Sequence, residues 1–412
     1  MISPEALQEH LQRRLPDALD LLQRMVVINS WTENRDGVHR LGRLTEEAFA
    51  PFGFEAERVP SCNPAWGEHL ILTRRGESER SIAMVSHLDT VFSPEEEARN
   101  RFHWSVEGDR LFGPGTHDIK GGSVMMWLVL DALRALAPRV FTSVTWRLLW
   151  NSSEEVLSPD FGDLCRTRLG TDTLAALVFE AEGKGPGVRR LVVARKGRGT
   201  WRVRVAGRGA HAGVQPARGA NAIVELSRVV RRIADLTDDA RQLTFNVGII
   251  RGGSGLNRVP HEAEAEGEFR AFDPRVYSTA REQLRGLAGP GEISSPVDGF
   301  RCAVDVGVLS ETRPWPRNAE TDRLLAHFVV AASELGQRVE GEQRGGLSDG
   351  NHLWDHVPTL DGLGPSGDND HCSERSADGS KLPEYADRSS FVPKAALNVV
   401  ALLRILAADS AS

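Results

Sequence analysis

The stretch SIAMVSHLDTVF, residues 81–92, joins a short apolar run to a histidine and an aspartate. A continuous apolar run of this length is typical of a strand that is buried on both faces, as in a parallel sheet. His87 and Asp89 then stand two residues apart, so both side chains would leave the strand's carboxyl end on the same side. A carboxylate behind a histidine orients the imidazole for a metal or for proton transfer, but a His near an acid is also common on surfaces.

Strand-like and helix-like segments alternate around this stretch. Further strands are predicted at 142–150 and 174–180, and helices at 17–29, after a break at Pro16, and at 121–137. This alternation favours the α/β class, with a mostly parallel central sheet flanked by helices.

The pattern changes after the glycine-rich EGKGPG. TWRVRVAGR alternates apolar and charged residues like a strand with one wet face, and NAIVELSRVVRRI carries one apolar helical stripe. Two more half-exposed strands follow. We therefore expect a small inserted α+β sandwich domain at 195–305. The larger domain would be discontinuous, covering 1–194 and 306–412, and would end in helices at 319–336 and 394–407.

Composition limits the kinds of partner and the cellular compartment that we expect for this chain. A length of 412 residues favours two domains, and a net charge of −7 gives no reason to expect nucleic acid as a partner. The four cysteines form no CxxC pair, which argues against a disulfide framework and a thiolate zinc site. We expect no signal sequence and no apolar run of membrane length, and hence a cytoplasmic protein.

Polar residues follow several of the predicted strands, where ligands gather in open α/β sheets. They lie in GPGTHDIKGG (113–122), NSSEEV (151–156), VFEAEG (178–183) and GLGPSGDNDHC (362–372). Taken singly, each has an ordinary explanation as a solvated loop or a helix cap. Taken together, two His and three carboxylates on one rim suffice to hold two zinc ions that share a bridging carboxylate, and Co²⁺ or Mn²⁺ would suit the same ligands.

A dinuclear site of this kind also needs a carboxylate that is not a ligand. Two metal ions can trap a water molecule, lower its pKa and polarise a carbonyl, and a general base must then move the water's proton. Glu154 and Glu155 would point to opposite sides in an extended segment, so that one could bind metal while the other faced the water.

The ordered set of these stretches resembles the M20 dinuclear zinc peptidases, above all the branch of glutamate carboxypeptidases and acetylornithine deacetylases. The resemblance covers nearly the whole chain and includes four further stretches: GRGAHAGVQPARGANAI, IIRGGSGLNRVP, EGEFRAFD and GGLSDGN. It implies a zinc-exopeptidase fold with an inserted dimerisation, or lid, domain.

The resemblance also implies roles. His87 and Glu180 would hold one zinc, Glu155 and His371 the other, and Asp118 would bridge them. Asp89 would hydrogen-bond the His87 imidazole, and Glu154 would be the general base. A cis peptide is expected at Asp118–Ile119. His211 would stabilise the oxyanion in the partner's site of a homodimer, and Asn257 and Arg270 would contact the substrate.

Some positions keep alternatives open. Arg270 could instead pair with Glu264, Glu266 or Glu268 on the strand surface. His117 could be an extra ligand, although a supporting or surface role is expected. A supporting role near His371 is expected for Asp349, no ligand role for Cys372, and helix-face positions for His352 and His356.

The expected function is a zinc-dependent hydrolase that cleaves an amide or peptide bond next to a C-terminal carboxylate, in the manner of a glutamate carboxypeptidase. The close alternative is an N-acyl-amino-acid deacylase of the aminoacylase or acetylornithine deacetylase type. A phosphate-binding enzyme is disfavoured, because Ile119 and Gly121 flank Lys120 where a P-loop needs Gly and Ser or Thr. A metal-free binding protein would have lost ligands, and all five are present.

Overall fold

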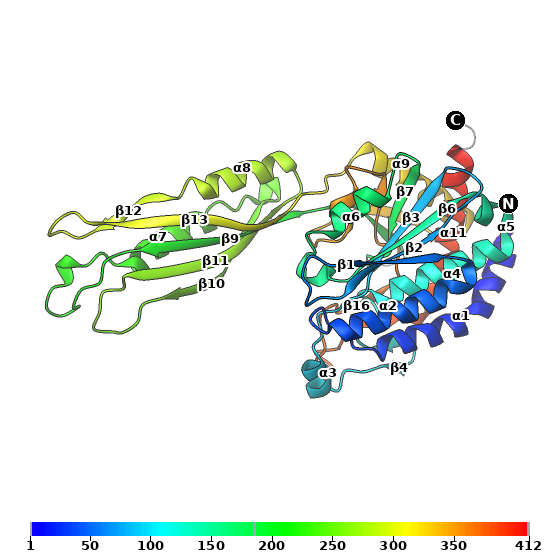
Figure 1. The fold of residues 1–412 in the computed structure, drawn as a ribbon, viewed down its shortest axis with the longest axis horizontal. Helices are drawn as coiled ribbons and strands as arrows, with labels where there is room; N and C mark the ends of the chain where they lie inside the picture. The colour runs from blue at the N-terminus through cyan, green and yellow to red at the C-terminus, as the bar shows by residue number, and fades with distance from the viewer. Residues whose placement is uncertain (1, 184–186, 410–412) are drawn as a thin grey trace. The chain divides into compact units, whose positions relative to one another are not determined.

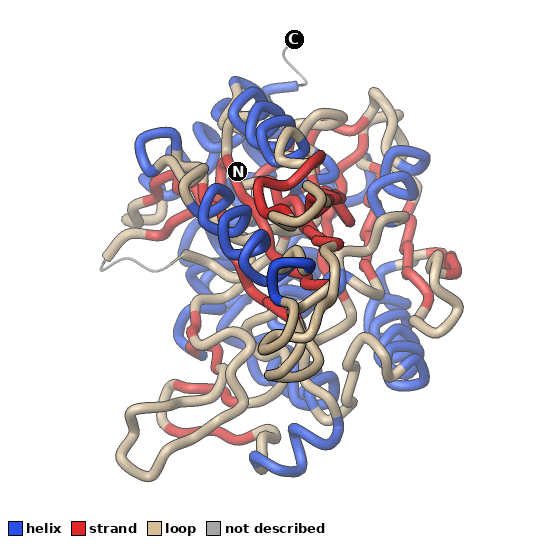
Figure 2. The backbone as a smooth tube through the Cα atoms, turned by 90° about the vertical axis from the view of Figure 1, so that its left-hand side faces the viewer, coloured by secondary structure: helices blue, strands red, loops and turns tan. Residues whose placement is uncertain are grey.

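The computed structural model describes residues 2–183 and 187–409, which form two compact units. Of these residues, the first unit comprises 2–183, 187–193, 317–343 and 348–409, and the second comprises 194–316 and 344–347. Figure 1 labels many of the elements of both units, and Figure 2 distinguishes helix from strand along the backbone.

A six-stranded sheet forms the centre of the first unit, as far as the chain is described. Its order is β1 (Glu55–Pro60), β2 (Glu68–Arg74), β6 (Thr145–Asn151), β3 (Ser81–His87), β7 (Thr173–Val178) and β15 (Thr359–Leu360). The four strands from β6 to β15 run parallel, β2 pairs antiparallel with β6, and β1 pairs antiparallel with β2 at the edge. The predicted mostly parallel sheet is therefore confirmed, and β3 lies at its middle with all seven residues buried.

Successive side chains of these strands point to opposite faces of the sheet, and a layer of helices covers each face. Leu70, Met84 and Leu148 face one core, while Ile71, Val85 and Leu149 face the other. The helices of the first layer are α1 (Pro4–Val26), α2 (Arg35–Phe49), α4 (Lys120–Leu136), α9 (Ala319–Glu334) and α11 (Phe391–Asp409). Those of the second are α6 (Phe161–Arg168) and α10 (Gly350–Leu353).

Shorter elements complete this unit. They are the helices η1 (Ala50–Phe52), α3 (Pro94–Asn100), α5 (Pro138–Ser143), η2 (Glu154–Val156) and η5 (Arg388–Ser390), a sheet of β4 (Ser105–Glu107), β5 (Arg110–Phe112), β17 (Tyr385–Asp387) and β16 (Gly367–Asp368), and the pair β8 (Arg189–Arg195) with β14 (Val339–Arg344).

The predicted helix break at Pro16 is wrong. Helix α1 runs from Pro4 to Val26 with Pro16 inside it. Proline removes one backbone hydrogen bond, but Leu7 and Leu11 before it and Leu21 and Leu22 after it are all buried in the core. Burial on both sides of the proline keeps the helix continuous.

The second unit is a five-stranded antiparallel sheet covered by two helices. The strand order is β10 (Thr244–Gly252), β11 (Glu262–Ala271), β9 (Gly197–Ala206), β13 (Arg301–Thr312) and β12 (Gly289–Ser294). Helices α7 (Ala222–Ala234) and α8 (Pro274–Arg285) pack on one face, where Leu226 and Leu284 meet Trp201 and Val203 in a core of their own. Short turns η3 (Pro216–Arg218) and η4 (Asp239–Arg241) lie in the connections.

The predicted boundary at residue 305 falls inside β13 and is wrong. That strand pairs with β9 from Ala303 to Thr312, so it belongs to the second sheet along its whole length. Pairing across one sheet cannot be divided between two domains, and the second unit accordingly extends to Pro316 and takes in residues 344–347.

One segment, Arg388–Asp409, is long and apolar enough to cross a membrane by length and composition, although no such run was expected. Its most apolar window is 67% buried within the structure. Leu397, Leu402 and Leu406 of α11 pack into the first core, as the residues of a core helix do.

Candidate metal centre

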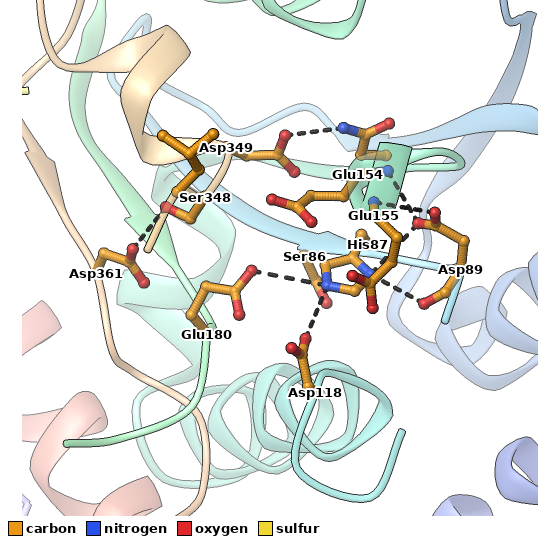
Figure 3. Close-up of polar contacts among 12 residues, drawn as sticks. Ser86, His87, Asp89, Asp118, Glu154, Glu155, Glu180, Ser348, Asp349 and Asp361 are labelled. Atoms are coloured by element: carbon orange, nitrogen blue, oxygen red, sulfur yellow. Dashed lines mark hydrogen bonds and ion pairs between the residues drawn. The ribbon is translucent and has the colours of Figure 1, made fainter. Parts of the chain in front are cut away.

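His87, at the carboxyl end of β3, is surrounded by acceptors (Figure 3). Its Nε2 atom lies 3.0 Å from Oδ1 of Asp118 and 3.7 Å from Oε1 of Glu180. Its Nδ1 atom donates to the main-chain carbonyl of Asp89 at 3.0 Å. This bond places the proton on Nδ1, so the lone pair of Nε2 faces two carboxylates, an arrangement that a cation stabilises.

The second oxygen of Asp118 faces another group of donors. Oδ2 lies 3.4 Å from Nε2 of His371, and the same nitrogen lies 3.2 Å from Oε2 of Glu155. The ligand atoms of His87, Asp118 and Glu180 all lie within 4.8 Å of one another, and so do those of Asp118, Glu155 and His371. The two groups share Asp118, as the sequence predicted for a bridging carboxylate.

Asp89 supports both glutamates as well as His87. Its Oδ1 atom accepts from the amide of Glu154 at 3.0 Å, and Oδ2 accepts from the amide of Glu155 at 3.2 Å and from Thr32 Oγ1 at 2.7 Å. Its carboxylate lies 3.4 Å from Nδ1 of His87. The expected contact with the imidazole is thus made mainly by the carbonyl of Asp89, while the carboxylate fixes the neighbouring turn.

Glu154 and Glu155 lie in the 3₁₀ turn η2 and not in an extended segment, so that expectation is wrong. The two amides that Asp89 holds, together with the bond from Leu157 N to Glu154 O, close the chain into a turn. The side chains still diverge. Glu155 reaches His371, whereas Figure 3 shows the Glu154 carboxylate directed toward the space between Asp349 and Glu180.

The electrostatics reflect crowded carboxylates. Burial, with the charges of Glu180 and Asp349 nearby, raises the pKa of Glu154 well above its usual value. Burial and the charge of Asp118 raise the pKa of Glu155 to about 7. Hydrogen bonds to Asp118 and Glu155 raise the pKa of His371 to about 11. The pocket thus carries an excess of negative charge that protons or metal ions must neutralise.

The donor set fits two zinc-sized cations. Donors at about 2.0–2.2 Å from a tetrahedral zinc lie about 3.3–3.6 Å apart, and the distances here run from 3.0 to 3.7 Å. The Oε1 atom of Glu155 is buried and has no hydrogen-bond partner in the structure. Burying a carboxylate oxygen without a partner costs free energy, unless a cation binds that oxygen.

Sequence reasoning missed Glu384. This residue is fully buried, and its Oε1 atom accepts from the amides of His117 at 3.0 Å and Asp118 at 3.2 Å. It therefore fixes the backbone of the bridging residue, whose peptide bond to Ile119 is cis as predicted. Nothing in the local pattern distinguishes Glu384 from a surface glutamate, since its partners lie more than 260 residues away along the chain.

Lys120 has a structural role. Its Nζ atom is buried and donates to the carbonyl of Ile28 at 3.0 Å. Burial lowers its pKa to about 8. A P-loop lysine must reach a phosphate, so this position does not support the phosphate-binding alternative.

The other candidates in this unit are not ligands of the two groups. His352 lies on α10, and His356 follows it and donates from Nε2 to the carbonyl of Leu169. The Sγ atom of Cys372 lies 3.8 Å from the carbonyl of Glu374, in its own loop. Asp349 accepts from Asn151, at the end of β6, at 2.8 Å, so the support it gives goes to the Glu154 turn instead of His371.

The second unit brings two of its predicted residues together. His211 is exposed, residue 211 forms an isolated bridge with Arg258, and the amide of Ala212 donates to the carbonyl of Asn257 at 2.9 Å. Arg270 forms a two-pronged ion pair with Glu268, at 2.8 and 3.2 Å, and donates to the carbonyl of Gly345. The structure thus shows the strand-surface pairing of Arg270, and its contact with a substrate stays a prediction.

Comparison with known proteins shows what this chain is similar to. A model described as a peptidase dimerisation domain matches residues 193–288. Carboxypeptidase G2 of Pseudomonas sp. (strain RS-16) is 27% identical over 91% of this chain and 86% of its own. An M20 family metallo-carboxypeptidase from Sulfolobus solfataricus shares the fold, with a TM-score of 0.69 and 13% identity over 93% of this chain and 98% of that chain. The chain is thus similar to M20 peptidases along nearly its whole length.

These similarities support a hydrolase of peptide or amide bonds. A second branch is also similar. Acetylornithine deacetylase of Edwardsiella ictaluri is 23% identical over 71% of this chain and 80% of its own. The dimerisation-domain match covers β9, α7, β10 and β11, most of the second unit.

Proposed function

We propose that this chain is a zinc-dependent hydrolase that cleaves an amide or peptide bond next to a C-terminal carboxylate, as a carboxypeptidase does. The observation that carries the proposal is Asp118, whose two oxygens face two separate donor groups, with Glu154 beside them as a carboxylate outside both. The similarity to carboxypeptidase G2 over nearly the whole chain favours this activity.

His87 and Glu180 would hold one metal ion, His371 and Glu155 the other, and Asp118 both. When bound, the ions would polarise the scissile carbonyl and lower the pKa of an attacking water. Glu154 would take the water's proton and then deliver it to the leaving nitrogen. Burial raises the pKa of Glu154 well above its usual value, and a raised pKa favours a carboxyl group that returns the proton as an acid after taking it as a base.

A second candidate is an N-acyl-amino-acid deacylase. It uses the same bond chemistry and differs in which side of the amide the pocket recognises. The similarity to acetylornithine deacetylase supports it. Which substrate the chain prefers depends on contacts between the substrate and the side chains of the pocket. One methylene group more or less changes the free energy of such discrimination by only about 1–3 kcal/mol.

We also propose a homodimer in which His211 acts on the partner's site. An exposed imidazole can donate a hydrogen bond to the oxyanion that develops during attack. Mixing inactive His211→Ala and Glu154→Gln proteins tests this. If His211 acts on the partner's site, subunit exchange restores activity. If mixtures stay inactive although mass spectrometry shows mixed dimers, the proposed action on the partner's site is wrong.

The test of function is a substrate panel. Zinc-loaded protein would be incubated with N-acetyl amino acids, dipeptides and N-acyl glutamates, and products followed by mass spectrometry. We expect release of a free C-terminal amino acid, and none from Glu154→Gln protein carrying the same metal. Cleavage of N-acetyl amino acids alone would favour the deacylase. No cleavage of any member by protein with both ions bound would contradict both candidates.

A further inference from the structure

Two residues outside the ligand set connect the loops that carry two of the ligands. His117 directly precedes the bridging Asp118, and Asp370 directly precedes His371. The Nδ1 atom of His117 is hydrogen-bonded to Oδ1 of Asp370. The two loops are 253 residues apart in the chain, and this bond joins them one residue away from the ligands on each side.

The position of the His117 ring is fixed. The residue is only 4% exposed, and its amide donates to the buried Glu384. The ring lies against Gly367, where an added Cβ would come within 2.6 Å of its Cδ2 atom. Its Nε2 atom has no hydrogen-bond partner, and His117 belongs to neither donor group found among the described residues. The ring is therefore anchored as a support and not placed as a third histidine ligand.

The His371 loop needs such support. The side chain of His371 is 54% exposed, in contrast with 1% for His87. His371 has a φ angle of 62° and Asn369 one of 65°, which is the left-handed region that residues other than glycine rarely adopt. Strained backbone of this kind persists only where surrounding contacts determine it. Between these two residues stands Asp370, tied to His117.

We propose that His117 and Asp370 form a latch that positions His371 against Asp118 and so sets the affinity of the second metal position. His87 and Glu180 do not depend on this bond, because they lie at the ends of β3 and β7. The proposal rests on the metal centre of the proposed function. It assigns to His117 and Asp370 a positioning role and no contact with substrate.

The test measures metal affinity without substrate. Co²⁺ would be titrated into chelator-treated protein and followed by visible absorption and calorimetry. For Asp370→Ala and for His117→Ala we expect one of the two Co²⁺ affinities to fall about 10- to 100-fold, the range for lost ligand supports, while the other is unchanged. The double variant should lose no more than either single variant, since all three break the same bond.

Two matched variants separate this role from general loss of structure. His117→Asn keeps a donor near the Nδ1 position and should restore most of the affinity. His10→Ala removes another buried histidine, bonded to Asp131 at 2.9 Å on α1 and α4, and should leave both Co²⁺ affinities unchanged. Melting temperatures of all variants in chelator should show that each is folded at the assay temperature.

The outcomes are distinct. Unchanged Co²⁺ affinities in Asp370→Ala or His117→Ala would overturn the latch, and so would an equal loss at both positions. Asp370→Leu, which keeps the size of the side chain but removes the acceptor oxygen, gives the same decision if Asp370→Ala does not fold. Wild-type protein that binds fewer than two Co²⁺ ions would contradict the metal centre and the latch with it. Failure to cleave any substrate would contradict only the proposed function.

Discussion

Two neighbouring glutamates acquire different chemistry from their surroundings. Glu155 lies against His371 and shares the second donor group. Glu154, one residue earlier, belongs to neither group and lies near Glu180 and Asp349, whose negative charges add to burial in raising its pKa. Under the proposed function, the same side-chain type would serve as a ligand at one position and as a proton carrier at the next, because one turn directs them to different partners.

Glu154→Gln tests this division at the residue scale. Glutamine keeps the size of the side chain but cannot take a proton at neutral pH. We expect kcat to fall about 10²- to 10⁴-fold, the usual contribution of a general base, while both metal ions stay bound and KM changes little. Steady-state kinetics and metal analysis of one preparation would check it. A variant with near-normal kcat would assign the proton transfer to another group.

Glu384→Ala tests the support that the sequence did not reveal. Removing the acceptor leaves the amides of His117 and Asp118 without their partner in a buried place. We expect metal affinity to fall about 10- to 100-fold. Glu384→Gln retains an acceptor oxygen and should lie close to wild type. Equal losses in the two variants would mean that the charge of Glu384, and not its hydrogen bonds, is what the site needs.

At the scale of elements, strand ends and one turn build the centre. His87 ends β3, and the Glu154 turn follows β6, its parallel neighbour. His69 of β2 holds this turn from the other side, because its Nδ1 accepts from the amide of Ser152 at 3.2 Å. Its Nε2 lies 3.3 Å from Asp160, just before α6.

The periodic parts of these elements could be predicted, and the irregular parts could not. Continuous apolar runs identified β3, β6 and β7 because burial on both faces leaves a pattern in the sequence. The turn at Glu154 depends on the carboxylate of Asp89, and the course of α1 through Pro16 depends on a core formed later in the chain. The resemblance to M20 peptidases implied five candidate ligands, and the structure brings these five side chains together. Asp349 was placed near His371, although its partner is Asn151.

The Asp160→Asn variant tests whether Asp160 supports this turn, through the pH dependence of the free energy of unfolding. Burial acts to raise the pKa of Asp160, but its hydrogen bonds with His69, Ser158 and Cys62 outweigh burial and leave the pKa below its usual value. A carboxyl group whose pKa is lower in the folded chain stabilises the fold above the unfolded pKa, and loses that contribution as the pH falls toward the folded pKa. We expect Asp160→Asn to lower the free energy of unfolding by about 1 kcal/mol at pH 7, allowing for partial exposure.

The difference in the free energy of unfolding between wild type and Asp160→Asn should shrink below about pH 4, where the aspartate of the unfolded chain becomes protonated. Urea denaturation at pH 7 and pH 3.5 would measure it. Asp163→Asn, an exposed aspartate in the first turn of the same helix, is the control and should change little. A difference that is the same at both pH values would show that the charge of Asp160 contributes nothing.

At the scale of the whole molecule, the second unit offers surfaces for a partner. Strand β10 is an edge of its sheet, and Ile249 and Ile250 on it are 42% and 59% exposed. On α7, Ile223 and Val224 are 40% and 44% exposed. An edge strand with exposed apolar residues favours pairing with another chain, and both elements lie within the dimerisation-domain match.

Ile250→Glu tests the dimer. A glutamate at this exposed position costs a monomer little but would bury a charge in an interface. We expect multi-angle light scattering to show a change from dimer to monomer. The melting temperature of the second unit produced by itself should be unchanged. Val297→Glu is the matched control, because Val297 is also 59% exposed and lies beyond β12, at the opposite edge of the sheet. Dimers in both variants would exclude β10 from the interface, and a monomeric wild-type chain would contradict the dimer itself.

The most direct measurement of the central claim counts metal ions and amide hydrolysis in the same protein. Chelator-treated chain would receive zinc in steps, with bound metal measured by mass spectrometry of the intact protein and release of a C-terminal amino acid followed at each step. The donor geometry predicts two bound ions per chain, activity that is lost on chelation and full activity only with the second ion. Hydrolysis that continues after both ions are removed would contradict a metal centre built on Asp118.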